Sequence, residues 1–167
     1  MSQYRRLAVP GGTIFFTLRL QDRNARLLVE RIDLLRMAMR LCKDRWPFDI
    51  EEAVVLPNQM HVILTLPQGD ADFSKRWRLI KSVFSRHVDR PAVVSDSMQR
   101  RGEKGIWQRR FWEHQIRDKA DYQQHRDFLL LAPVREGLVA RAEDWQYSSI
   151  HRTGGMGRVF GAVVAAE

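Results

Sequence analysis

The chain of 167 residues is poor in cysteine, in acidic residues and in long apolar runs. Its single cysteine, Cys42, can form neither an intrachain disulfide nor a cysteine-based zinc cluster, which fits a reducing compartment. Apolar runs such as "FLLLAPV" are far shorter than the roughly 20 residues that cross a bilayer, and the first residues lack the apolar core of a signal peptide. We therefore expect a cytoplasmic protein that does not enter a membrane.

Basic residues outnumber acidic ones by 28 to 20, and the formal net charge is +8. The excess is concentrated: residues 71–119 hold 13 Lys or Arg and 6 Asp or Glu, a net of +7. Basic side chains neutralise phosphates and release counterions. The composition predicts a polyanionic partner, with nucleic acid first and an anionic membrane surface second.

The hydrophobic pattern of the first half predicts a strand, a helix and a hairpin. β-Branched and aromatic residues fill "TIFFTLRL" (Thr13–Leu20), and the apolar residues that follow recur at helical spacing from a cap at Asp22 to Trp46. The segments "FDIEEAVVLP" and "MHVILTLP" then indicate two antiparallel strands. On the second of these strands one face is expected to carry Met60, Val62, Leu64 and Leu66, and the other His61, Ile63 and Thr65.

The second half predicts two more helices separated by a loop and a strand. A helix begins at Asp72 or Ser74 and runs to about Val88, and residues 90–105 are expected to form a polar loop. A strand follows in "RRFWEHQIR", and a last helix runs from Asp118 to about Leu131, where Pro133 ends or breaks it. The core stripe of the first of these helices is Phe73, Trp77, Ile80 and Phe84.

This order of elements, βαββαβα with a central hairpin, predicts an α+β sandwich of the ferredoxin-like or RRM-like type, an antiparallel sheet with helices packed on it. We expect one domain over residues 1–152 and a C-terminal tail over 153–167.

Three stretches carry chemistry and occur in a fixed order: "VLPNQMHVIL", "GIWQRRFWEHQIRD" and "RDFLLLAPVREGLVARAEDWQYSS". Together, and by the spacing between them, they resemble the REP-associated tyrosine transposases, single-strand nucleases of the HUH class linked to repetitive extragenic palindromes (REP). The likeness runs from Tyr4 to Arg152. It implies a hairpin-forming DNA substrate and cleavage by a tyrosine that becomes covalently joined to the DNA.

The resemblance also implies a metal site, with two histidines on a strand and a polar side chain four residues after the tyrosine of a "Y-I-H-x-N-P-V" stretch. His61 matches the second histidine, while Gln59 stands at the first. Phe128 stands at the tyrosine and Ala132 at the polar position. Since residues 128 and 132 are four apart, we expect them on one helix face.

Phe128 is the departure with the largest consequence, because a phenyl ring cannot attack phosphorus. Tyr122 and Tyr147 are the substitute nucleophiles to consider, although Tyr122 is expected roughly 120° around the helix from Phe128. Gln59 and His61 remain weak candidates for binding Mg²⁺ or Mn²⁺. DNA binding itself is expected to need no cofactor. The other histidines, His87, His114, His125 and His151, show no ligand-like spacing and are expected to be surface or structural residues.

Basic and aromatic residues interleave in the basic third of the chain, a mixture typical of proteins that hold phosphates with cations and stack bases on rings. The same residues could form only a solvated helix face and a core strand. Trp77, on the apolar stripe, is expected in the core. The residues expected to contact DNA are Arg76, Arg78, Lys81, Arg86, Trp107, Arg109, Arg110 and Trp112.

The sequence therefore favours a DNA-binding protein of transposase descent that recognises a palindromic or hairpin single strand without cutting it. The first alternative is an active metal-dependent single-strand endonuclease that uses a substitute nucleophile. The second is an RNA-binding module, because the fold and the basic, aromatic surface suit that ligand as well. The sequence leaves open whether the protein is a monomer or a homodimer.

Overall fold

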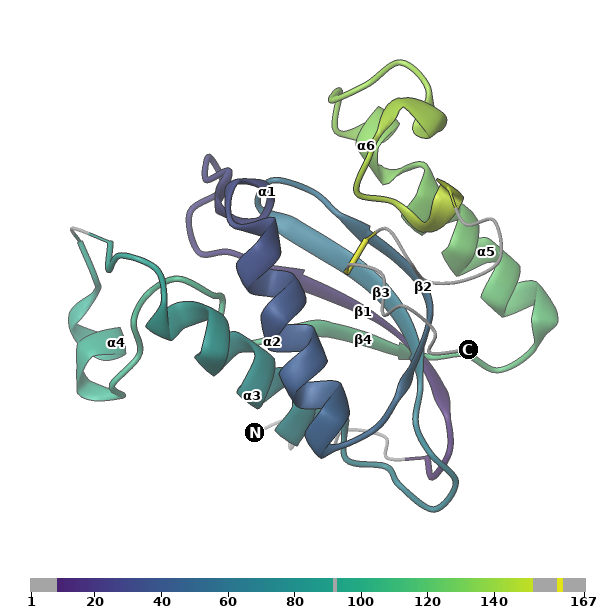
Figure 1. The fold of residues 1–167 in the computed structure, drawn as a ribbon, viewed down its shortest axis with the longest axis horizontal. Helices are drawn as coiled ribbons and strands as arrows, with labels where there is room; N and C mark the ends of the chain where they lie inside the picture. The colour runs from purple at the N-terminus through teal and green to yellow at the C-terminus, as the bar shows by residue number, and fades with distance from the viewer. Residues whose placement is uncertain (1–8, 92, 152–158, 161–167) are drawn as a thin grey trace.

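The computed structural model describes residues 9–91, 93–151 and 159–160, and shows an antiparallel sheet in the order β2-β3-β1-β4 (Figure 1). The strands are β1 (Thr13–Arg19), β2 (Asp49–Val55), β3 (Gln59–Thr65) and β4 (Trp112–Gln115). The helices are α1 (Leu27–Glu30), α2 (Ile32–Arg45), α3 (Phe73–Arg86), α4 (Asp96–Arg100), α5 (Lys119–Leu130) and α6 (Ala132–Arg135), with 3₁₀ turns η1 (Ala142–Asp144) and η2 (Ser149–His151). No helix among the described residues is long and apolar enough to span a membrane.

The sheet has a core on each face, because residues alternate along β1 and β3. The alternate residues from Met60 to Leu66 pack with α2 and α3, whereas Ile63 packs with Phe15 and with Leu129 of α5 on the opposite face. Figure 1 shows α2 and α3 on one side of the sheet and α5 and α6 on the other. The predicted α+β class and the predicted faces of β3 are confirmed.

The first helix begins later than expected. Asp22 does not cap it, because the Asp22 carboxylate accepts a hydrogen bond from the amide of Asn24 at 2.9 Å and closes a local turn instead. The helix starts at Leu27 and is interrupted at Arg31, which has non-helical backbone angles (φ −116°, ψ 38°). The prediction of one continuous helix from Asp22 was wrong at its start.

The helices of the second half follow their predicted caps. Asp72 accepts from the Lys75 amide at 3.0 Å, and Asp118 accepts from the Asp121 amide at 2.8 Å. The whole predicted stripe of α3 is buried, Trp77 included. The loop predicted over residues 90–105 instead contains α4, because Ser95 caps the Met98 amide and starts a short helix.

The segment after α6 returns to the edge strand β2. The indole of Trp145 donates to the carbonyl of Val55 at 2.9 Å. Glu52, in β2, accepts a hydrogen bond from Arg126 of α5 at 2.8 Å and another from the Ser149 hydroxyl. One buried carboxylate thus joins β2, α5 and the C-terminal turn.

The predicted tail lies mostly outside the described residues. Its two described residues, Val159 and Phe160, are buried against the α2 side of the sheet, and Arg36 donates to the Val159 carbonyl at 3.1 Å. This part of the segment therefore packs on the core.

We expect Glu52→Ala to lower the free energy of unfolding by about 2 kcal/mol, because it leaves polar partners around a buried site unpaired. Chemical denaturation followed by tryptophan fluorescence measures the change. The matched control is Glu143→Ala, which removes a carboxylate with 59% side-chain exposure and should change stability little. Equal effects of the two changes would contradict the structural role of Glu52.

Candidate nucleic-acid interface

Gln59 and His61 lie on the face of the sheet that α5 covers, and the strand register gives each a partner. His61 pairs with Thr17, and Gln59 pairs with Arg19 on β1. The Thr17 hydroxyl lies 2.7 Å from Nδ1 of His61, whose exposure is only 2%. The imidazole is thereby fixed within the sheet, as the alternation along β3 predicts.

Phe128 stands next to this histidine. Its ring centroid lies 5.4 Å from that of His61, edge to face, and 6.0 Å from that of Phe15. The guanidinium carbon of Arg135 lies 3.9 Å from the centre of the Phe128 ring, a cation–π contact. The side chain is 45% exposed, an unusual state for a phenylalanine. The ring therefore occupies the place beside His61 that the resemblance assigns to a nucleophile.

Among the residues that the structure describes, two cavities border Phe128. One, of about 430 Å³, is lined by Phe15, Thr17, Arg19, Trp112, Gln124, His125 and Phe128. The other, of about 490 Å³, is more polar and is lined by Arg19, Leu20, Arg23, Asn58, Gln59, His61, Gln108, Phe128, Arg135 and Glu136. We call the second the His61 cavity.

The charge around the His61 cavity is positive. Burial, followed by the nearby guanidinium groups of Arg135 and Arg19, lowers the pKa of His61 to about 3. The imidazole is therefore neutral at physiological pH. The carboxamide oxygen of Gln59 accepts a hydrogen bond from Nε of Arg19 at 3.1 Å, while its nitrogen faces Glu136 at 3.4 Å.

These residues do not fit a divalent cation. Mg²⁺ and Mn²⁺ need ligand atoms that can face the ion, but a guanidinium holds the Gln59 oxygen. Ala132 offers no ligand; it is fully buried and lines neither cavity beside Phe128. Phe128 lies in α5 and Ala132 is the first residue of α6, with Leu131 between the two helices.

Neither tyrosine considered as a substitute lies at the site. Tyr122 of α5 is partly buried against the core on the α5 side, and Tyr147 contacts the ring of Trp145 and packs against the core on the α2 side. Neither ring lines a cavity that borders Phe128.

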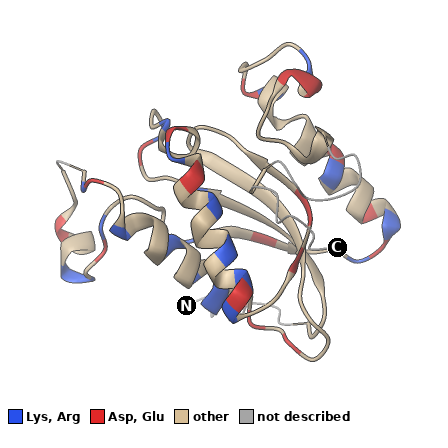
Figure 2. Cartoon of the chain, in the orientation of Figure 1, with Lys and Arg blue, Asp and Glu red and all other residues tan. Residues whose placement is uncertain are grey.

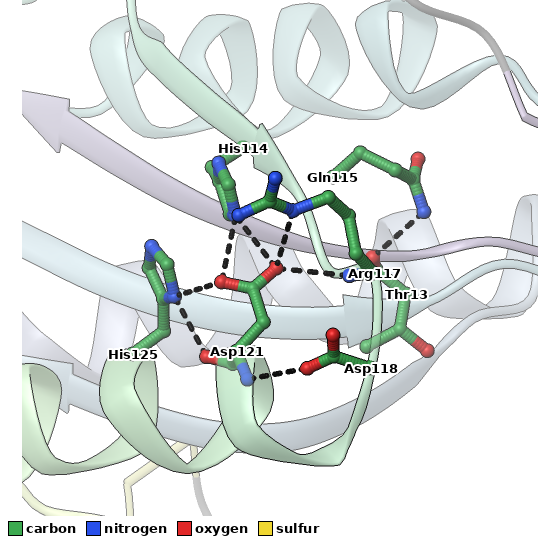
Figure 3. A network of polar contacts seen from close by, with 7 residues as sticks. All are labelled: Thr13, His114, Gln115, Arg117, Asp118, Asp121 and His125. Atoms are coloured by element: carbon green, nitrogen blue, oxygen red, sulfur yellow. Dashed lines mark hydrogen bonds and ion pairs between the residues drawn. The ribbon is translucent and has the colours of Figure 1, made fainter.

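A second polar cluster ties β4 to α5, as Figure 3 shows. Nε2 of His114 donates to the Asp121 carboxylate at 2.8 Å, and the Arg117 amide donates to the same carboxylate at 2.9 Å. Nδ1 of His125 donates to the Asp121 carbonyl at 2.8 Å. Burial raises the pKa of Asp121, but the hydrogen bonds from His114 and the Arg117 amide outweigh it and hold the pKa at about 2.

Three potential metal ligands meet in this cluster, their ligand atoms lying within 4.8 Å of one another. The rings of His114 and His125 are nevertheless stacked, with centroids 4.2 Å apart and planes 12° apart. A metal lies in the plane of each imidazole that binds it, so two nearly parallel rings do not point nitrogens at one ion. The cluster is a hydrogen-bonded clamp, and the expectation that these histidines are structural agrees with it. The i, i+4 spacing of Asp121 and His125 is the sequence signal that was missed.

Five of the residues expected to contact DNA meet at one cavity of about 720 Å³ between α3 and residues 101–109: Arg78, Lys81, Arg86, Trp107 and Arg109. Arg101 and Lys104 add positive charge, and Glu103 pairs with Arg101 at 2.8 Å. Figure 2 shows the Lys and Arg positions along α3 and near α4. We call this the α3 cavity. Arg110 is exposed next to Arg109 in the chain but does not line the cavity.

Arg76 does not belong to this surface, so its prediction as a DNA contact was wrong. It is 1% exposed and donates to the Asp70 carboxylate at 2.7 Å and to the carbonyl groups of Trp46, Pro47 and Asp72. The hydrogen bond from Arg76 lowers the pKa of Asp70 to about 2. Arg76 therefore joins α3 to the segment that precedes β2.

The two tryptophans predicted to contact DNA lie in different environments. Trp107 is 7% exposed and packs edge to face on Phe84, so the prediction that bases stack on it was wrong. Trp112 is 63% exposed and lines the 430 Å³ cavity beside Phe128, on the other face of the sheet from the α3 core.

No protein-family model matches the chain. The REP-associated tyrosine transposase of Escherichia coli (strain K12) is 45% identical over 152 residues, 91% of this chain and 84% of the relative. A putative REP-associated tyrosine transposase of Haemophilus influenzae (strain ATCC 51907 / DSM 11121 / KW20 / Rd) is 39% identical over 153 residues, 91% of this chain and 87% of the relative. A solved structure of a REP-associated tyrosine transposase bound to a REP hairpin aligns with a TM-score of 0.77 and 45% identity, covering 91% of this chain and 84% of that one.

Arg76→Met and Arg78→Met form a matched pair, because the two residues are two positions apart on α3 and differ in burial. We expect Arg76→Met to lower the free energy of unfolding by about 3 kcal/mol, since it leaves Asp70 and three carbonyl groups without their donor. Arg78→Met should leave stability within about 0.5 kcal/mol of the parent. Denaturant titrations measure both, and a stable Arg76→Met variant would refute the assigned role.

His61 should make the folded state less stable in acid. Between pH 6.5 and about 3 the unfolded chain binds a proton at this residue that the folded chain does not, so stability falls as pH falls. The contribution is up to about 1.4 kcal/mol per pH unit. Unfolding titrations at pH 7, 6 and 5 should show a shallower pH dependence for His61→Gln than for the parent. The exposed His87→Gln is the control, and identical slopes for all three proteins would contradict the low pKa.

Proposed function

The chain belongs to the REP-associated tyrosine transposases, and on this premise we propose that it binds a hairpin-forming single DNA strand of the REP type and does not cut it. The family assignment follows from identities of 45% and 39% over nine-tenths of the chain. The structure that shares 45% of its sequence is bound to a REP hairpin, which supports hairpin DNA as the partner of this chain.

The missing hydroxyl at residue 128 is the observation that carries the proposal. Strand cleavage with covalent capture needs an oxygen positioned to attack phosphorus. Phe128 lies against His61 and Arg135, so the position is filled by a packed ring. Tyr122, also on α5, is partly buried and packs against the core between the helix and the sheet. The protein therefore keeps the family's scaffold but lacks the nucleophile at residue 128.

The α3 cavity supports the binding half of the proposal. Its lining combines several cations with the Ser82 and Ser85 hydroxyl groups and only one acidic residue, Glu103. Arg101 and Arg109 both lie near that carboxylate, at 2.8 Å and 3.8 Å. The surface therefore stays positive and can follow a phosphate backbone without reading bases.

One observation favours the rival function, an active nuclease. The Thr17 hydroxyl lies 2.7 Å from His61, which is the arrangement of a hydroxyl nucleophile and a base. The pKa of about 3 makes this imidazole a very weak base at neutral pH, however. Thr17 is also only 5% exposed. We therefore prefer binding without cleavage.

Labelled REP-type hairpin DNA incubated with the protein and Mg²⁺ or Mn²⁺ tests the proposal. We expect binding that weakens steeply with salt and needs no metal, and neither a shortened strand nor a covalent adduct on a denaturing gel. Arg78→Glu with Arg86→Glu should weaken binding, whereas Arg141→Glu, an exposed charge beyond α6, should not.

Two further arms decide between the functions, and a third examines the scaffold. A denaturant-resistant adduct that disappears in Tyr122→Phe or Thr17→Val would establish the nuclease. An RNA hairpin of the same sequence that binds more tightly than the DNA would establish the RNA-binding module. The triple change Gln59→His, Phe128→Tyr, Ala132→Asn asks whether the scaffold still supports cleavage once the family's groups return.

A further inference from the structure

The His61 cavity is lined by three guanidinium groups and one carboxylate. Arg19, Arg23 and Arg135 stand around it, and Glu136 is the acidic residue of its lining. The three arginines are exposed, so their donors can reach a ligand. His61 is neutral and therefore adds no charge. The lining thus has an excess of positive charge where the family pattern would place a cation.

Contacts with the protein hold two of these guanidinium groups in place. Nε of Arg19 donates to Gln59, its cross-strand partner in the sheet. Arg135 lies on the ring of Phe128 at 3.9 Å, and its Nη1 donates to the Phe128 carbonyl at 3.2 Å. Each contact engages one donor nitrogen and leaves the others of the same guanidinium for a ligand. Such restraint reduces the entropy lost on binding.

We propose that the His61 cavity is a metal-free phosphate site, in which Arg19 and Arg135 bind a phosphodiester of the DNA strand. The inference rests on the proposed function, because a strand must reach the α5 face of the sheet. Residues at one implied metal-ligand position and at the nucleophile position each orient a guanidinium instead: Gln59 accepts from Arg19, and Phe128 carries Arg135 on its face. Guanidinium groups bind phosphate oxygens through paired, charge-assisted hydrogen bonds.

The rest of the lining suits the same ligand. Asn58 and Gln108 contribute amide groups: each nitrogen donates one hydrogen bond to a backbone carbonyl, of Arg23 and of Leu20, and has a second N–H that can donate to an anion. The carboxylate of Glu136 faces the nitrogen of Gln59 at 3.4 Å. The volume of about 490 Å³ lies within the range of roughly 300–1,000 Å³ for small-ligand sites, so a phosphate fits with its adjoining sugars.

Small probes test the site on the full-length protein without a hairpin. The dinucleotide thymidylyl-thymidine carries one internal phosphodiester, and thymidine 5′-monophosphate carries one terminal phosphate. Heteronuclear NMR follows the Nε–H signals of Arg19 and Arg135, assigned by their loss in the Arg19→Gln and Arg135→Gln variants. We expect saturable shifts with the dinucleotide in the presence of EDTA. Tighter binding of the monophosphate would overturn the assignment to an internal phosphate.

Variants give the quantitative test. Arg135→Gln should weaken dinucleotide binding about tenfold, the loss of a charged hydrogen-bonding group, and Arg135→Lys should recover part of it. Arg141→Gln, which removes an exposed arginine outside the cavity, should have no effect. Unchanged binding in Arg135→Gln, an absence of shifts in the parent, or binding that appears only with Mg²⁺ would each overturn the inference.

A hairpin with a single-stranded extension separates this inference from the proposed function. If the hairpin binds but the dinucleotide shifts no arginine signal, the phosphate site fails and the proposed function stands. If the dinucleotide binds and the hairpin does not, the phosphate site stands and hairpin recognition fails. A neutral methylphosphonate at one position of the extension should weaken binding by the parent more than binding by Arg135→Gln, which keeps only Arg19 at the site.

Discussion

The antiparallel register of β1 and β3 is the constraint on which the site depends. It places Arg19 opposite Gln59 and Thr17 opposite His61, with all four side chains on the face that α5 covers. A shift of the register by one residue would turn these side chains toward the other face of the sheet. Because the apolar core is buried on that face, the shift is unfavourable. With the register fixed, a guanidinium takes the Gln59 oxygen and helps to keep the buried His61 neutral. In a site with all of the family's ligands, a metal ion would supply positive charge. Here arginine side chains of the protein supply it.

The rest of the fold preserves the position of α5 although residue 128 has no hydroxyl. The clamp around Asp121 attaches the start of α5 to β4, and the buried Glu52 attaches its middle to β2 through Arg126. These contacts hold Phe128 beside His61, where its ring supports Arg135. The same contacts would position a catalytic tyrosine at residue 128. In this chain we propose that they position arginine side chains around a phosphate. Loss of cleavage and retention of the scaffold are therefore compatible.

The sequence predicts the fold well because the signals are local. Alternation along β3 and the caps Asp72 and Asp118 depend on neighbours in the chain, and the structure confirms them. Asp22 is the exception, since its side chain satisfies a nearer amide. Burial of a charged residue is not local: Arg76 lies among exposed basic residues of α3, and the carbonyl groups that bind it come from around Trp46 and Pro47. The roles of Arg19, Arg135 and the clamp likewise arise only when distant segments meet.

Electron paramagnetic resonance of Mn²⁺ mixed with the free protein tests the central claim most directly, because the hexaaqua ion loses its signal when a protein binds it. With guanidinium groups in the cation's place, we expect the full signal of the free ion at equimolar millimolar concentrations. A reduced signal in the parent that the His61→Asn variant restores would show a metal at His61, and would contradict a metal-free site.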